Sequence, residues 1–98
     1  MAKFSAEDSH ATEARHFLRE RGGLSHLRAR CRADVLTLES GRAEDPIPHA
    51  RLRREGVHLW RLEMPNSSGG WEKTPHRALL GEVLRVLAED YPWMLARI

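Results

Sequence analysis

The sequence contains a single cysteine and no long apolar run, and each absence excludes a class of protein. With Cys31 alone, no disulfide can form within the 98-residue chain. The start of the chain has no apolar segment of the kind that directs secretion. The longest apolar-rich stretch, residues 78–88, is interrupted by Glu82 and Arg85 and is too short to span a bilayer. We therefore expect a cytoplasmic protein that needs no membrane.

Charge of either sign is plentiful, but neither sign dominates. The chain has 16 Lys and Arg against 14 Asp and Glu, and only Lys3 and Lys73 are lysine. Arginine suits bidentate contacts with phosphate or carboxylate, yet a net charge of +2 does not by itself indicate a nucleic-acid-binding protein. The length and the 41% hydrophobic content predict one small domain over residues 1–98.

The first third of the chain predicts a helix and then a hairpin. Ser5 as N-cap, with Asp8 completing a capping box, begins a helix over 6–21 that ends at the glycines 22–23. A narrow apolar stripe follows it: Ala6, His10, Ala14, Phe17 and Leu18. From 27 the period becomes two, and a two-residue turn at 33–34 sets Arg28 opposite Glu39 and Arg30 opposite Thr37. The buried face of this hairpin is then Leu27, Ala29, Cys31, Leu36 and Leu38.

Residues 40–48 predict a polar loop, because Pro46 and Pro48 interrupt a strand pattern. The segments 49–53 and 57–64 predict a second hairpin around 54–56. A two-residue loop would place Trp60 on the face of the arginines, whereas a three-residue loop, with Gly56 in a left-handed bulge position, separates apolar from charged residues. We prefer the second register, because a buried face requires that separation. It groups Ala50, Leu52, His58, Trp60 and Leu62.

The remaining residues predict a loop over 65–70, a Trp71 that folds back over the core, and a final helix. Thr74 as N-cap and Pro75 at the first helical position begin this helix. Its buried arc is Leu79, Leu80, Val83, Leu84, Val86, Leu87 and Tyr91. Pro92 ends it, and an apolar tail that we expect to be ordered follows: Trp93, Met94, Leu95 and Ile98.

The predicted fold is α+β, in the order α-β-β-β-β-α, with a four-stranded antiparallel meander and two helices packed on one face. This order resembles in outline the layout of double-stranded-RNA-binding domains. In those domains the second helix starts with lysines that hold phosphate. Residues 73–77 read Lys-Thr-Pro-His-Arg, so no residue role is carried over.

No pattern in the chain predicts catalysis or metal binding. None of the six histidines has the paired spacing of a zinc site, and His10 and His16 fall on different sides of their helix. Cys31 is expected to be buried and unreactive. Ser67 and Ser68, and the glycines 69–70, lack the flanking residues of a nucleophile elbow or a phosphate loop. We expect no enzyme, no catalytic residue, no metal and no cofactor, although a site built from distant residues would leave no pattern.

The outer face of the predicted sheet is the one candidate binding surface. Its candidate residues are Arg28, Arg30, Arg32, Arg51, Arg53, Arg61, Val57 and Leu59, with Val35 among them and Glu39, His49 and Glu63 at the margins. Apolar groups rimmed by arginine are typical of a protein interface or of a nucleic-acid-binding sheet. The first hypothesis is an interaction or regulatory module that binds another protein, or itself, through this face or the apolar tail. The second is nucleic-acid binding, which the expected lack of stacking aromatics on the face disfavours.

Overall fold

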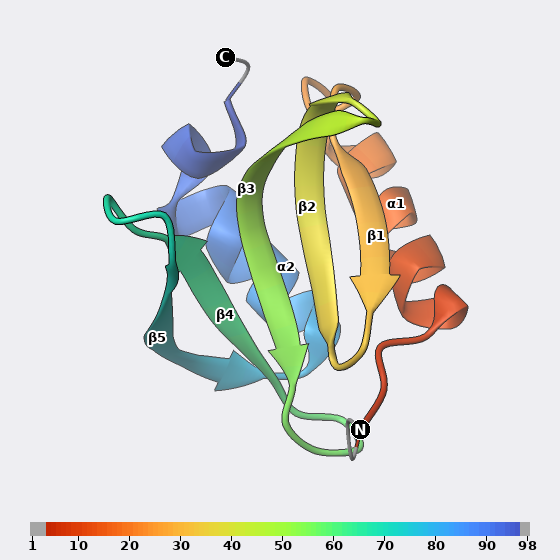
Figure 1. The fold of residues 1–98 in the computed structure, drawn as a ribbon. Coiled ribbons are helices and arrows are strands. Elements are labelled where there is room, and N and C mark those ends of the chain that lie inside the picture. Colours follow the sequence, from red (N-terminus) through yellow and green to blue (C-terminus); the bar gives the residue numbers. More distant parts are fainter. Residues whose placement is uncertain (1–3, 97–98) are drawn as a thin grey trace.

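Five antiparallel strands and two helices make up the part of the chain that the computed structural model describes, residues 4–96. In chain order these are α1 (Asp8–Arg21), β1 (Arg28–Arg32), β2 (Val35–Arg42), β3 (Asp45–Arg54), β4 (Trp60–Pro65), β5 (Trp71–Ala78), α2 (Leu80–Asp90) and the 3-10 helix η1 (Pro92–Leu95). The strands form one sheet in the order β1-β2-β3-β4-β5, and both helices lie behind it in Figure 1. The α+β class is confirmed, but the sheet has five strands where four were predicted. Within residues 4–96 neither helix is long and apolar enough to cross a membrane.

The β1–β2 hairpin has the predicted register. Arg28 lies opposite Glu39 and Arg30 opposite Thr37, and the turn residue Ala33 has a φ of 54°. Of the predicted buried face, only Cys31 is half-buried instead of buried. Its Sγ donates to the backbone oxygen of Glu7 at 3.3 Å. Burial raises the pKa of the Cys31 thiol.

Residues 40–42 and 45–48 form strand, where a loop was predicted for 40–48. Strands β2 and β3 continue to a turn at 43–44, where Arg42 pairs with Asp45. Counting from that turn, Pro46 and Pro48 take positions whose nitrogen points away from β2. On that side β4 reaches only residues 51–54 of β3. The prolines therefore remove no hydrogen bond from the sheet, and the strand tolerates them.

The β3–β4 connection is longer than predicted, and this moves three residues off the sheet. The loop spans 55–59, and Leu52 pairs with Leu62 and Arg53 with Arg61. Because the pairing differs from the predicted one by an even number of residues, Ala50, Leu52, Trp60 and Leu62 still share the buried face. His58 does not join them and is exposed, and Val57 and Leu59 also belong to the loop.

The predicted start of the last helix is instead part of β5. Between Arg61 and Glu63 the β4–β5 register shifts, so that residues 74–76 bulge out of the edge strand. The Thr74 hydroxyl donates to the backbone oxygen of Leu62 at 2.9 Å and accepts from the backbone N–H of His76 at 3.2 Å. Thr74 thus caps a bulge, and Pro75 sits at an edge, where it costs no ladder bond.

Each helix begins later than predicted. The N-cap of α1 is Glu7, not Ser5, and its backbone N–H donates to Nδ1 of His10 at 2.9 Å. The His10 ring meets Trp60 edge-on at 4.8 Å between centroids, and burial, followed by the Arg54 charge, lowers the pKa of His10. The N-cap of α2 is Leu79, which is 58% exposed. The core lies between the helices and the sheet: Ala11, Ala14, Leu18, Leu36, Leu38, Leu52, Trp60, Leu62, Leu80, Val83, Leu84 and Leu87 are among its buried residues.

Two imidazoles hold the apolar tail against the sheet. His49 Nδ1 lies 2.7 Å from the backbone oxygen of Met94, and His26 Nε2 lies 2.7 Å from that of Leu95. Leu95 is buried in the core, whereas Trp93 is 65% exposed. The tail is therefore ordered through residue 95, and the prediction for Ile98 lies outside the described residues.

Candidate functional site

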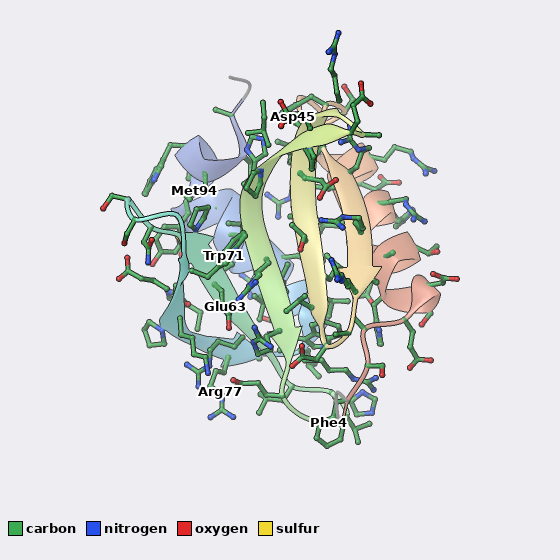
Figure 2. All side chains as sticks on the ribbon, in the orientation of Figure 1. Phe4, Asp45, Glu63, Trp71, Arg77 and Met94 are labelled. Atoms are coloured by element: carbon green, nitrogen blue, oxygen red, sulfur yellow. The ribbon has the colours of Figure 1, made fainter. Side chains whose placement is uncertain are left out.

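The outer face of the sheet, which points toward the viewer in Figures 1 and 2, carries its side chains in rows that run from strand to strand. Residues directly opposite each other in an antiparallel sheet share a face, so the register defines the rows. The upper row is Arg30, Thr37, Arg51, Glu63 and Lys73, and the lower row is Arg32, Val35, Arg53, Arg61 and Arg77. This face is neither uniformly cationic nor apolar at its centre.

The lower row places arginines next to one another, which is unfavourable unless carboxylates lie between them. Two turns supply these carboxylates. Asp34, from the β1–β2 turn, accepts two hydrogen bonds from Arg53 Nη1, both 2.8 Å long. Glu55, from the β3–β4 loop, accepts from Arg61 Nε at 3.0 Å and from Arg77 Nε at 2.8 Å. Each arginine in the β3–β5 part of the row therefore has a turn carboxylate as a partner, and Arg61 and Arg77 share theirs.

Glu63 is the carboxylate at the centre of the face, and it is only 1% exposed. It accepts from Arg51 Nε at 2.6 Å and from Arg53 Nε at 2.9 Å. Burial alone would raise the pKa of Glu63, but the hydrogen bonds from Arg53 and Arg51 outweigh burial, and the pKa lies below its ordinary value. The hydrogen bond to Glu63, and to a smaller extent the one to Asp34, raises the pKa of Arg53. Glu63 is thus a charged group that fixes two arginines.

Trp71 lies on the outer face and not over the core, contrary to the prediction. The Arg51 guanidinium carbon is 4.5 Å from the centre of the Trp71 ring, the separation of a cation–π contact. Figure 2 shows Trp71 above Glu63, between β3 and β5. The face therefore carries one aromatic side chain, which the sequence argument took to be missing.

The β1 side of the face has more cations than carboxylates. Arg30 Nε donates to Glu39 at 3.0 Å, and Arg28 Nη2 lies 3.5 Å from the same carboxylate, which is buried. The Arg32 side chain has no hydrogen bond or ion pair with any residue from 4 to 96. Three guanidinium groups thus stand beside a single carboxylate here, and two of them, those of Arg28 and Arg30, share it.

A shallow hollow of about 330 Å³ lies between these arginines and Trp71. We call it the Thr37 hollow, because Thr37 pairs with Arg30 on one side and Arg51 on the other. Apolar groups of Val35, Pro46 and Pro48 line it together with Glu39, Arg30, Arg32, Arg51 and Trp71. It joins apolar surface to arginine side chains whose Nη atoms have no hydrogen-bond partner within the described residues.

The structure places the six predicted arginines, Val35, Glu39 and Glu63 on this face, but not Val57, Leu59 or His49. Val57 and Leu59 lie in the loop beyond the strand ends, and Val57 lines a different hollow with α1 and α2. His49 is buried on the opposite side. Sequence reasoning missed Trp71, Lys73 and Arg77, because residues 71–78 alternate too irregularly around their bulge to predict a strand.

Metal-ligand geometry does not occur in the part of the chain described: no three His, Cys, Asp or Glu side chains lie close enough together to hold an ion. Ser67 and Ser68 lie in the β4–β5 loop, where the Asn66 side chain accepts from the Ser68 backbone N–H at 3.1 Å. This Asx-type turn accounts for the residue types at 66–70, which connect β4 to β5.

The molecule is thus a small α+β protein with one covered and one uncovered sheet face. Compared with protein-family models, with curated proteins and with solved structures, the chain has no significant match to any of them.

Proposed function

We propose that the protein is a non-enzymatic interaction module that binds another protein through the outer face of its sheet. One observation carries this proposal: the arginines around the Thr37 hollow keep Nη donors without partners beside an apolar surface. A solvated sheet face needs charge but has no need of a hollow with apolar walls. Apolar contact area edged by arginine is what protein interfaces use.

The same face argues against self-association as its purpose. Two copies stacked face to face would bring cationic side chains against one another, because β1, β3 and β5 all carry them, and like charges at short range are costly. The apolar tail is a poorer interface than the sequence suggested, because Leu95 is part of the core and, of the tail residues up to 96, Trp93 alone is widely exposed. We therefore place the partner on the outer face.

Affinity capture from cells that produce the protein, followed by mass spectrometry, tests the proposal. Thr37→Glu puts a carboxylate between Arg30 and Arg51, where it forms cross-strand ion pairs, keeps the fold and fills the hollow. Thr12→Glu, an exposed position on α1, makes the same change elsewhere. A partner should be retained by the wild type and by Thr12→Glu, and lost by Thr37→Glu. Equal retention by both variants would refute the outer face as the interface.

Nucleic-acid binding is the second candidate, and the position of Trp71 favours it. An aromatic ring beside an arginine is a common stacking platform for bases. Gel shifts with single-stranded RNA and duplex DNA at two salt concentrations test it. Each phosphate contact adds about one unit to the slope of the logarithm of the affinity against the logarithm of the salt concentration. Trp71→Ala should weaken binding to single strands if bases stack there. No shift at low salt eliminates this candidate.

A further inference from the structure

The balance of cations and carboxylates differs between the two sides of the outer face, and this difference indicates where a ligand would bind. Toward β4 and β5 each arginine has a carboxylate: Arg53 has Glu63 and Asp34, and Arg61 has Glu55. Toward β1 the balance fails. Arg28 and Arg30 share Glu39, and Arg32 has no partner in residues 4–96. A negatively charged ligand therefore gains most at the β1 side.

Two arginines that line the Thr37 hollow, one from β1 and one from β3, leave the ends of their guanidinium groups available. Arg30 and Arg51 each donate through Nε to a buried carboxylate, Glu39 and Glu63 respectively, which fixes the orientation of the planar group. Their Nη atoms have no partner among the described residues, and the Nη edge of arginine is suited to carboxylate oxygens. The buried glutamates thus hold two donors in place for an incoming anion.

The spacing along β1 is that of an extended chain. Arg30 and Arg32 stand two residues apart on one side of the strand, a separation of about 6.6–6.8 Å. Carboxylates at every second residue of an extended segment have the same spacing. Between the arginines of β1 and Arg51, Val35 and the prolines 46 and 48 offer apolar surface to an intervening side chain.

Building on the proposed function, we propose that the partner presents an extended acidic segment, with carboxylates at alternate residues, to the Thr37 hollow. Its carboxylates accept hydrogen bonds from Arg30, Arg32 and Arg51. Charge complementarity selects this occupant over a second copy of the chain, which offers the same cations. It is also favoured over a nucleic acid, because Arg51 already occupies one side of the Trp71 ring.

A fluorescein-labelled peptide that alternates aspartate with valine, titrated with the full chain in fluorescence anisotropy, tests the proposal. Arg32→Gln removes a charge that makes no ion pair with residues 4–96, so the fold is unaffected. It should weaken peptide binding by about tenfold, the loss of one charge-assisted contact. Arg19→Gln, on the exposed side of α1, is the control with the same charge change and should change binding by less than about twofold, within the range of remote surface charges. Thr37→Glu should abolish binding while the melting temperature is maintained.

Three outcomes overturn the acidic-segment proposal: no binding of the peptide, equal weakening by Arg19→Gln and Arg32→Gln, or displacement of the peptide by a single-stranded RNA that binds more tightly. The failure is distinguishable from failure of the proposed function. If Thr37→Glu still releases the captured partner while the peptide does not bind, the face is an interface for a partner of different chemistry. If Thr37→Glu retains the partner, the face is not the interface at all.

Discussion

Replacing Glu63 by glutamine tests most directly whether this buried carboxylate holds the arginines of the outer face in place. The substitution keeps the shape of the side chain and removes the charge that binds Arg51 and Arg53. Removing one partner of a fully buried pair costs roughly 3–5 kcal/mol. Here the arginine side chains are 22% and 27% exposed, so water relieves part of the loss, and Arg53 keeps Asp34. We expect Glu63→Gln to lower the free energy of unfolding by about 2–3 kcal/mol, or roughly 10–20 °C in melting temperature.

The pH dependence of stability gives a second, independent reading of the same variant. The pKa of Glu63 is lowered in the fold, so its ionised form stabilises the native state above the ordinary carboxyl value of about 4.3. That contribution is lost as pH falls through the lowered pKa. The difference in stability between wild type and Glu63→Gln should therefore narrow as pH falls from about 5 toward 3.

Urea melts at several pH values measure both effects. Glu44→Gln is the matched control, because Glu44 is 74% exposed and lies 3.9 Å from Arg42. It should change stability by less than about 0.5 kcal/mol at neutral pH. If the two variants lose the same amount at pH 7, the buried carboxylate does not organise the arginines as described.

Two further predictions concern the core and the tail. Leu84 is 1% exposed, so Leu84→Ala should cost about 2–5 kcal/mol in urea melts, and a loss below about 1 kcal/mol would place it outside the core. Leu95→Ala should lower the melting temperature clearly, because the side chain is 1% exposed, whereas Trp93→Ala should change it little. Equal shifts for these two variants would show that the tail does not pack as the structure has it.

The parts of the fold that local patterns determine could be predicted from the sequence. In residues 28–39 strict alternation and a two-residue turn specify the pairing, so the register Arg28–Glu39 was predictable. The buried and exposed faces of the second hairpin were predictable as well, because only a register shift by an odd number of residues exchanges the two faces. Its loop length was not, since residues 55–59 contain no turn dipeptide that distinguishes three residues from five.

The errors came from signals that have two structural meanings. Thr74-Pro75 is a strong helix start, but the same hydroxyl bonds stabilise a bulge at an exposed edge, and only the neighbouring strand decides between them. Pro46 and Pro48 predict a loop unless the neighbouring strand on their nitrogen side is too short to reach them. Strand β4 is too short in this way, and its length relative to β3 cannot be derived from the local sequence. For the candidate surface, the position of the arginines on one face was predictable from alternation, whereas Trp71 joins that face only because residues 71–78 form a fifth strand.

The ion pairs among Arg51, Arg53 and Glu63 have a consequence for how these three positions change during evolution. Since loss of the Glu63 charge leaves two half-buried cations, a change at Glu63 should lower stability unless one of the arginines changes as well. These three positions should then covary during evolution, independently of any partner. The side chains of Arg32 and Thr37 form no such buried ion pair, so under the proposed function their conservation should follow the sequence of the partner.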